Sequence, residues 1–229
     1  MKPTFLLTSG GTKIKIDMVR SITNMSRGTF GSKIATEILL RKHDLVLLCA
    51  KDSRLPLNLS QNVPPFEDLY RLREYVTFDD YEKALMEELE KQPDIIILAA
   101  AVSDYGVENY VNGKIRSGKE LVIRLKPLPK LISMVRERCP NSSICGFKLL
   151  VNSTEQELTE AATKSLIDNR LDLVVANDLR DIKAGQHKLT IVEKNSLFYD
   201  DVVSSVHKEN LPKVVVQKCL KHFQLGVLR

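Results

Sequence analysis

The fold is decided by the stretch Ile95-Ile96-Ile97-Leu98-Ala99-Ala100-Ala101-Val102, which is apolar throughout. This is the longest purely apolar run of the chain, and it falls far below the ~18 residues that a membrane-spanning helix needs. A run of this kind predicts a strand that is buried on both faces of a parallel sheet. It therefore indicates an α/β fold.

Strand-like and helix-like patterns alternate on both sides of this stretch. Strands are predicted over residues 4–8, 45–49, 73–77, 121–125, 143–147 and 171–176, and helices over residues 30–42, 79–90, 155–169 and 209–223. Asp79 or Asp80 is expected to cap the second helix, and Pro129 is expected to open a further one. Such alternation is typical of a doubly wound, Rossmann-like and mainly parallel sheet.

Three segments depart from this alternation. Residues 55–66 contain several prolines and are expected to form a loop. Residues 106–120 are polar and contain glycine, so they are expected to form a flap. Residues 189–193 and 197–203 are predicted to pair as a hairpin near the C-terminus.

The length of 229 residues lies between one domain and two at ~150 residues per domain. Because the composition shows no linker-like shift and no internal repeat, a single domain over residues 1–229 is predicted. With 43% hydrophobic and 28% charged residues, the composition excludes a disordered or collagenous protein. The N-terminal apolar stretch is too short for a signal peptide, so a cytoplasmic protein without a membrane anchor is expected.

The formal net charge of +5 mildly favours anionic partners. Lysine and arginine are spread along the chain, aromatic residues make up 6%, and tryptophan is absent. A nucleic-acid-binding protein more often concentrates its basic residues in a stripe interleaved with aromatics. Small anionic ligands are therefore expected rather than nucleic acid.

The cysteines and histidines predict neither a metal site nor a disulfide framework. No C-x-x-C pair occurs, and no histidine lies at the spacing of zinc ligands. Cys49 and Cys145 fall within apolar runs and are predicted to be buried core residues. The four histidines lie in polar surroundings without a neighbouring serine or cysteine, so they are predicted to be surface residues rather than members of a catalytic triad.

Ligands of doubly wound sheets bind at the carboxyl ends of the strands, which directs attention to the loops after residues 8, 102, 147 and 176. The first of these loops, residues 8–12, consists of small residues whose backbone N–H groups could approach a phosphate. It matches neither dinucleotide-binding nor P-loop fingerprints, so a tight structural turn is an equally good interpretation. A second small-residue loop, residues 24–28, precedes a helix and carries the amide of Asn24.

Tyr110 and Lys114 have the Y-x-x-x-K spacing of short-chain dehydrogenases. That chemistry needs both side chains on one helical face. The intervening Val-Asn-Gly sequence is poor helix material, and the N-terminal loop lacks the dinucleotide fingerprint. A dehydrogenase is therefore disfavoured.

Four segments together resemble a known family. They are residues 8–12 with 16–28, residues 99–105 with 114–115, residues 146–149 and residues 176–178, which read T-S-G-G-T with I-D-x-V-R-x-I-T-N-x-S-x-G, A-A-A-V-S-D-Y with K-I, G-F-K-L and A-N-D. In this order and spacing they resemble phosphopantothenoylcysteine synthetase, the ligase of coenzyme A biosynthesis, over about residues 3–223. The resemblance is closest to the stand-alone bacterial form of that enzyme.

The resemblance implies a two-step ligation. A nucleoside triphosphate, CTP in bacteria, would activate the carboxylate of 4'-phosphopantothenate as an acyl-nucleotidylate, and the amine of L-cysteine would then displace CMP. It further implies Mg²⁺ accompanying the nucleotide, no flavin, and a homodimer in which the flap or the late hairpin completes the partner's site. ATP in place of CTP and a non-catalytic nucleotide-binding module on the same fold remain alternatives. A flavin-dependent decarboxylase is disfavoured because its His/Cys pattern is missing.

The resemblance also assigns roles to residues. The catalytic residues would be Asn24, Lys114 and Arg20. Those that bind the nucleotide would be Gly10, Gly11, Ser26, Gly28, Ala100, Ala101, Asp104, Phe147, Lys148 and Asn177.

Three segments depart from the family pattern. The flap reads Lys-Ile-Arg-Ser at residues 114–117 instead of K-x-K-K, and Arg27 replaces the second serine of S-S-G. The basic pair that the family carries on the helix before the A-N-D segment is not clearly matched, and Lys164 is the nearest candidate. These departures bear on the contacts with the nucleotide.

Overall fold

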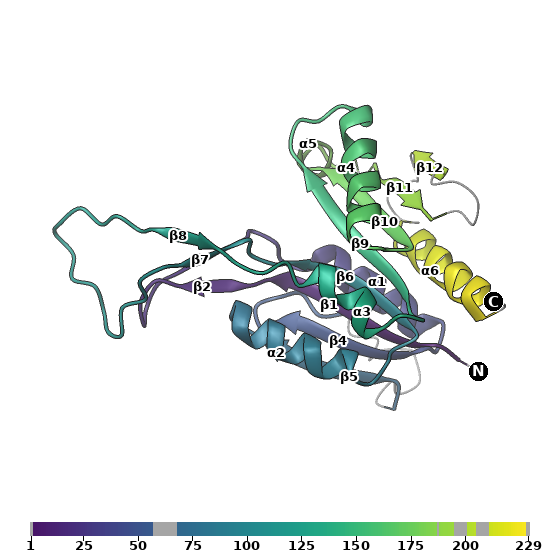
Figure 1. Ribbon diagram of the computed structural model, residues 1–229, viewed down its shortest axis with the longest axis horizontal. Coiled ribbons are helices and arrows are strands. Elements are labelled where there is room, and N and C mark those ends of the chain that lie inside the picture. The colour runs from purple at the N-terminus through teal and green to yellow at the C-terminus, as the bar shows by residue number, and fades with distance from the viewer. Residues whose placement is uncertain (1, 57–67, 187, 195–200, 205–210, 228–229) are drawn as a thin grey trace.

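The computed structural model describes residues 2–56, 68–186, 188–194, 201–204 and 211–227. Its centre is an eight-stranded sheet (Figure 1) with the order β5-β4-β1-β6-β9-β10-β11-β12. The strands are β1 (Thr4–Gly11), β4 (Asp44–Ala50), β5 (Tyr70–Tyr75), β6 (Ile95–Ala101), β9 (Ser143–Leu150), β10 (Leu173–Asp178), β11 (Thr190–Glu193) and β12 (Asp201–Ser204). In this sheet order, the strands β5, β4, β1, β6, β9 and β10 run parallel, and β11 and β12 are antiparallel to their neighbours. The predicted doubly wound, mainly parallel sheet is confirmed.

The strand order reverses between β1 and β6. From β1 the chain moves outward through β4 to β5, and then returns to β6 on the other side of β1. In the paired register, Gly10 lies opposite Ala100 and Gly11 opposite Ala101. The carboxyl ends of these two strands therefore form the switch point at which ligands bind in open α/β sheets.

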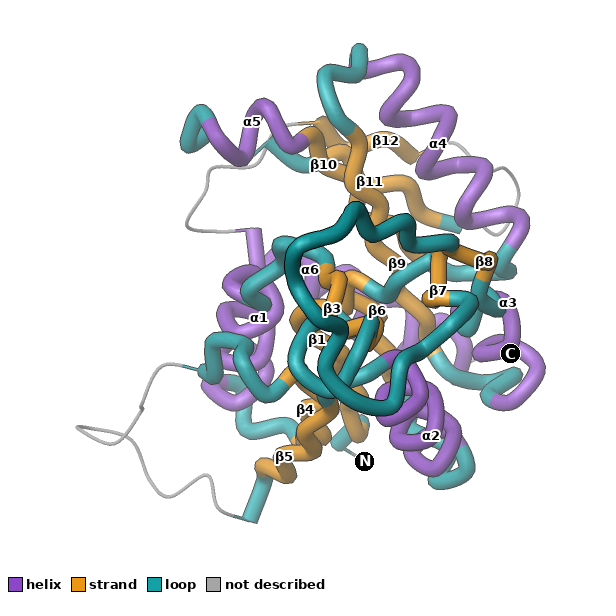
Figure 2. The backbone as a smooth tube through the Cα atoms, turned by 90° about the vertical axis from the view of Figure 1, so that its left-hand side faces the viewer, coloured by secondary structure: helices purple, strands orange, loops and turns teal. Residues whose placement is uncertain are grey.

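Helices cover both faces of the sheet, as Figure 2 shows. On one face, α1 (Thr29–Leu40) and α6 (Leu211–Val227) pack against the sheet. On the other face lie α2 (Phe78–Leu89), α3 (Ile132–Arg138) and α4 (Glu155–Asp168). Because both faces are covered, β6 is buried on both sides, and its three isoleucines have no exposed surface. A short helix, α5 (Leu179–Lys183), follows β10.

Two helix starts differ from the prediction. The cap of α2 is Thr77 rather than Asp79 or Asp80; its hydroxyl accepts a hydrogen bond from the Asp80 N–H, and the Asp80 carboxylate accepts one from the Thr77 N–H. This reciprocal capping box satisfies two free N–H groups of the first turn. Helix α3 begins at Ile132, three residues beyond the predicted start at Pro129.

A two-ribbon arm extends from the carboxyl edge of the sheet (Figure 1). One ribbon pairs β2 (Lys13–Lys15) with β3 (Ser21–Thr23), and the other pairs β7 (Tyr105–Val107) with β8 (Leu125–Pro127). The predicted strand over residues 121–125 is wrong, because only Leu125 enters a strand and Val122 is 76% exposed. Residues 108–124 instead form the long connection between β7 and β8, which contains most of the predicted flap.

Among the predictions for the C-terminal part and for single residues, some are confirmed and others are wrong. The late hairpin is confirmed as β11 and β12, although residues 195–200 between them lie outside the described residues. All four cysteines are free and buried, as expected of core residues. The surface assignment is wrong for His43, whose ring packs on Phe5, and for His222, which pairs with the buried Glu193. None of the helices in the described parts of the chain is long and apolar enough to span a membrane.

Candidate functional site

Two cavities lie at the carboxyl edge of the sheet, one on each side of the switch point. The first, of about 570 Å³, lies among the end of β1, residues 23–27, the loop 50–54 after β4 and the end of β5. The second, of about 370 Å³, lies among the end of β6, β9 and helices α2, α3 and α4. The structure thus offers two neighbouring binding spaces rather than one.

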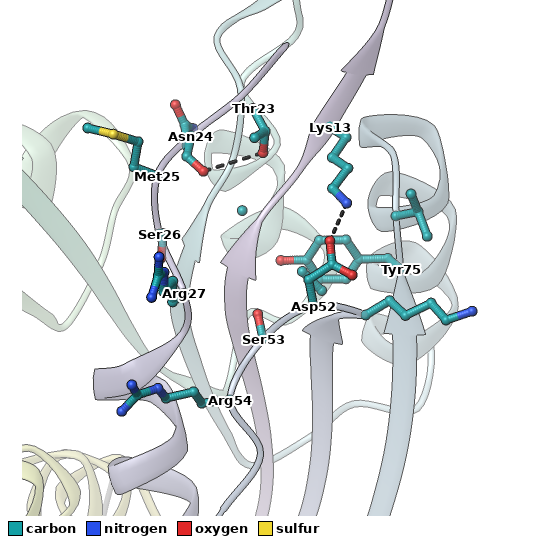
Figure 3. Close-up of a pocket in the computed structure, with 14 residues that line it drawn as sticks. Lys13, Thr23, Asn24, Met25, Ser26, Arg27, Asp52, Ser53, Arg54 and Tyr75 are labelled. Atoms are coloured by element: carbon teal, nitrogen blue, oxygen red, sulfur yellow. Dashed lines mark hydrogen bonds and ion pairs between the residues drawn. The ribbon is translucent and has the colours of Figure 1, made fainter. Parts of the chain in front are cut away.

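The first cavity contains three of the predicted site residues: Gly11, Asn24 and Ser26. Figure 3 shows its lining, in which the side chains of Lys13 and Asp52 form an ion pair. The burial of Asp52 is slight, and the hydrogen bond and charge of Lys13 lower its pKa. The lining contains four basic side chains but only one carboxylate, so this cavity favours anions.

Gly10 and Gly28 stand behind this cavity, and both adopt positive φ angles, +88° and +66°. A Cβ at Gly10 would lie 1.9 Å from the Oγ of Ser53, and a Cβ at Gly28 would lie 3.0 Å from the same atom. Both positions therefore require glycine, because of the backbone angle and because Ser53 fills the space that a side chain would need. In this structure the two glycines give room to the chain's own loop.

Asn24 stands between the two cavities. It lines the first, and its Nδ2 donates a hydrogen bond of 2.9 Å to the carbonyl oxygen of Ala101 at the end of β6. Ala100 and Val102, the neighbours of Ala101, line the second cavity. The side chain of Asn24 is exposed, so its amide is accessible to a ligand in the first cavity.

The second cavity gathers four more of the predicted residues: Ala100, Asp104, Phe147 and Lys148. Phe147 packs edge-on against Phe30 of α1, with ring centroids 5.9 Å apart, which holds its ring at the end of β9. The cavity also contains Lys164, the nearest candidate for the family's basic pair. Lys164 forms an ion pair of 3.1 Å with Asp168 one turn further along α4.

Arg20 and Lys114 line neither cavity and belong to the arm. The Nη2 of Arg20 donates to the carbonyl oxygen of Ile115 at 2.8 Å. The buried Asp17 holds the same segment, because its carboxylate accepts hydrogen bonds from the N–H groups of Val19, Arg20 and Ile115. Burial would raise the pKa of Asp17, but these N–H groups and the charge of Arg20 outweigh it and lower the pKa. Arg20 is thus joined to the segment that carries Lys114, and neither residue shares a cavity with the other predicted site residues.

Asn177 also lies outside both cavity linings. It occupies β10 opposite Leu149, and the next residue, Asp178, is a structural cap. The carboxylate of Asp178 accepts hydrogen bonds from Asn152, Ser153 and Arg180, and those of Ser153 above all lower its pKa to about 2. The A-N-D segment therefore orders the loop between β9 and α4.

Sequence reasoning missed several residues that line the cavities, namely Lys13, Lys51, Ser53, Arg54 and Lys130. The loops selected for inspection did not include the one after residue 50. The rule that ligands bind at strand ends applies to that loop too, since β4 neighbours β1. In the sequence, the replacement of the family's second serine by Arg27 indicated that this side of the site carries additional positive charge.

Comparison with known proteins gives consistent relatives. The family model of the DNA/pantothenate metabolism flavoprotein C-terminal domain matches residues 2–222. The coenzyme A biosynthesis bifunctional protein CoaBC of Thermococcus kodakarensis is 37% identical over 191 residues, which cover 83% of this chain and 45% of that protein. The chain thus spans about half the length of the curated relatives it matches.

Solved structures agree with the fold. The DNA/pantothenate metabolism flavoprotein of Streptococcus pneumoniae superposes with a TM-score of 0.82 at 33% identity, covering 96% of this chain and 99% of that one. A Cab2 mutant in complex with phosphopantothenate-cysteine superposes with a TM-score of 0.78, covering 99% and 88%. At 19% identity, the second likeness shows the fold alone.

Proposed function

The chain belongs to the family of the DNA/pantothenate metabolism flavoprotein C-terminal domain, and on this premise we propose that it is a phosphopantothenate–cysteine ligase of coenzyme A biosynthesis. The relatives named CoaBC, and a structural neighbour that holds phosphopantothenate-cysteine, support this substrate class. The observation that carries the proposal is the position of Asn24, at the boundary of two cavities that together can hold two substrates.

The proposed reaction has two steps. A carboxylate oxygen of 4'-phosphopantothenate attacks the α-phosphorus of CTP, and the bond to pyrophosphate breaks. The amine of L-cysteine then attacks the acyl carbon of this acyl-nucleotidylate; the C–N bond forms, CMP leaves and the amine loses a proton. The barrier of the first step is repulsion between a carboxylate and a triphosphate, so the protein must neutralise charge and hold the partners in line.

Asn24 suits the reacting centre because an amide nitrogen carries two N–H bonds. One is engaged by the carbonyl of Ala101, which fixes the orientation of the side chain. The second remains to donate to an oxygen of the acyl-nucleotidylate. An aspartate at this position would have no donor and would place a negative oxygen against the carbonyl oxygen.

We assign the nucleotide to the residues around the switch point, following the family pattern. Ala100, Asp104, Phe147 and Lys148 line the second cavity, and the ring of Phe147 turns towards Phe30 of α1. CTP is the proposed co-substrate and ATP the alternative. Lys164 lines the same cavity and belongs to the departures from the family pattern that concern the nucleotide contacts. Its positive charge is partly neutralised by Asp168.

Mg²⁺ would enter with the nucleotide phosphates. Among the described residues, no group of three or more His, Cys, Asp or Glu side chains could hold a metal ion. Mg²⁺ is commonly bound through one or two carboxylates and the substrate phosphates. Asp104, in the second cavity, is the carboxylate we assign to it, and the ion would supply charge neutralisation there.

We further propose a homodimer in which the arm completes the partner's site. Arg20 and Lys114, the two predicted catalytic cations, line neither cavity of their own chain. The arm around them exposes large apolar side chains, including Met18 at 68% and Val122 at 76%. An exposed apolar surface on a projecting element is typical of a protein interface.

The test is pyrophosphate release from purified protein with 4'-phosphopantothenate, comparing CTP, ATP, GTP and UTP, each with and without L-cysteine. We expect CTP to be the best co-substrate, and CMP and the amide product to accumulate only when cysteine is present. Binding of nucleotide without pyrophosphate release under any of these conditions would favour the non-catalytic alternative.

A further inference from the structure

We propose that the first cavity is a phosphate-binding site in which Arg27 and Arg54 hold a phosphate group and Ser53 donates a hydrogen bond to it. Arg54 and Ser53 come from the loop after β4, to which none of the predicted roles was assigned. The site itself is argued from geometry and charge. Only the identity of the phosphorylated molecule rests on the proposed function.

The charges of the cavity are unevenly distributed. Lys13 and Asp52 neutralise each other on one side. In the parts of the chain that the structure describes, neither Arg27 nor Arg54 forms an ion pair with a carboxylate. Figure 3 shows both arginines on the side of the cavity beside the helix start, away from the Lys13–Asp52 pair. Two guanidinium groups therefore stand together without a counter-charge.

The two arginines are held as a pair by the backbone. The N–H of Arg54 donates to the carbonyl oxygen of Arg27 at 3.0 Å, which joins the loop 50–54 to the segment before α1. The side chains thus start from adjacent points on two different loops. A guanidinium is planar and presents paired donors, so two of them can bind several oxygens of one phosphate.

Ser53 supplies an independent sign of a missing partner. Its Oγ is buried, yet it makes no hydrogen bond within the described residues. The hydroxyl lies against the backbone of Gly10 and Gly28, in the wall of the cavity. A buried hydroxyl without a partner is unfavourable. Rotation about the Cα–Cβ bond of Ser53, which lines the cavity, would turn the hydroxyl towards a phosphate oxygen that accepts its hydrogen.

The start of α1 adds to this anion preference. The helix begins directly after Gly28, has no side-chain cap and carries no acidic residue in its first turn. Free N–H groups and the positive end of the helix dipole therefore face the region next to Arg27. The cavity of about 570 Å³ also has room for the remainder of a phosphorylated molecule, which would extend towards Asn24.

The experiment measures binding by calorimetry for the wild type and for four variants of the full chain: Arg27→Glu, Arg54→Glu, Arg54→Lys and Ser53→Ala. The probes are CTP, CMP, 4'-phosphopantothenate and unphosphorylated pantothenate. Lys213→Glu, at an exposed position of α6, is the matched charge-reversal control. Circular dichroism verifies that each variant is folded, and Arg54→Lys tests the fork geometry in a variant that keeps the charge.

We expect each charge reversal to weaken the binding of one phosphorylated probe by about 10-fold or more, with a smaller loss for Arg54→Lys and Ser53→Ala. Loss confined to CTP and CMP would identify the group as a nucleotide phosphate. Loss for 4'-phosphopantothenate but not for pantothenate would identify it as the substrate's phosphate. Either result supports the site.

The proposal is overturned if the wild type binds none of the phosphorylated probes, or if Arg27→Glu and Arg54→Glu bind all of them as tightly as Lys213→Glu does. Because binding is measured without turnover, this outcome is distinct from failure of the ligase assignment. A protein that binds phosphate through these arginines but releases no pyrophosphate would contradict the ligase and leave the site intact.

Discussion

At the scale of single residues, the proposed role of Asn24 depends on the N–H donors of its amide, which a carboxylate lacks. Its Nδ2 donates to the Ala101 carbonyl oxygen at 2.9 Å and still carries a second N–H. We predict that Asn24→Asp reduces kcat for ligation by about 10²–10³-fold, the usual effect of removing one donor from a developing oxyanion. Steady-state pyrophosphate release measures this.

Because Asn24 is exposed, the thermal unfolding midpoint of the variant should stay close to that of the wild type. Asn141→Asp, at an exposed position in the loop between α3 and β9, is the matched amide-to-acid control. Full activity of Asn24→Asp would remove Asn24 from the mechanism.

Asp17 is a positioning residue for the flap rather than a catalytic one. One carboxylate oxygen accepts from the N–H groups of Val19 and Arg20 at 2.8 and 2.7 Å, and the other accepts from the N–H of Ile115 at 3.1 Å. In Asp17→Asn one oxygen becomes an NH₂ group that faces a backbone donor. We predict faster hydrogen exchange at residues 113–117 and a loss of about 10-fold in kcat/KM.

Asp79→Asn, exposed in the first turn of α2, is the control for this substitution. A structural defect elsewhere would lower the unfolding temperature without a local change in exchange. Unchanged exchange at residues 113–117 in Asp17→Asn would show that Asp17 does not hold the flap.

At the scale of elements, one buried carboxylate of the sheet pairs with two side chains of α6. Glu193, at the end of β11, is 5% exposed and contacts both Lys218 and His222 of α6. The hydrogen bond of His222 and the proximity of Lys218, opposed by burial, lower the pKa of Glu193 from 4.5 to about 2. The folded state therefore binds this proton less readily than the unfolded state does.

The sign of the pH dependence follows from that difference. The stabilisation is fully present above pH 4.5 and is lost as the pH falls towards 2, because the unfolded chain takes up the proton first. We predict that Glu193→Gln lowers the free energy of unfolding at pH 7 by on the order of 2–3 kcal/mol. Urea unfolding at pH 7, 4 and 3 should show the difference from wild type shrinking with acidity, whereas the exposed control Glu90→Gln should show no such trend.

How far the elements could be predicted depends on where their stabilising contacts lie. The strand over residues 95–101 was predictable because burial on both faces leaves an uninterrupted apolar pattern. The alternating apolar pattern of residues 121–125 led to a wrong strand prediction, because Val122 belongs to an exposed connection that has no sheet to pack on. The pairing of Arg54 with Arg27 could not be predicted, since it depends on a tertiary contact between two loops.

At the scale of the whole molecule, the projecting arm separates the residues of the proposed site into two groups. Asn24 and the cavity residues lie at the edge of the sheet, while Arg20 and Lys114 lie among the arm's own contacts. In the homodimer that we propose, two-fold symmetry would bring each arm to the other subunit's cavities and close the assembly. The exposed apolar side chains of the arm are the surface that this contact would bury.

We predict that Met18→Asp combined with Val122→Asp produces a monomer. Both side chains are more than two-thirds exposed, so charge at these positions should not disturb the folding of the subunit. Light scattering after size-exclusion chromatography measures the mass. Two aspartates at exposed positions of α6, Lys213→Asp and Lys221→Asp, give the matched control and should leave the dimer intact.

Complementation decides whether the flap acts across the dimer. If Lys114 serves the partner's cavities, a heterodimer of Asn24→Asp and Lys114→Ala subunits retains one site with both residues intact, although each parent homodimer is inactive. Random exchange makes about half of the dimers mixed with one working site each, so about a quarter of wild-type activity should return on co-refolding. If Lys114 serves its own chain, each site lacks one residue and no activity returns, which would contradict the shared site while leaving the ligase assignment to its own assay.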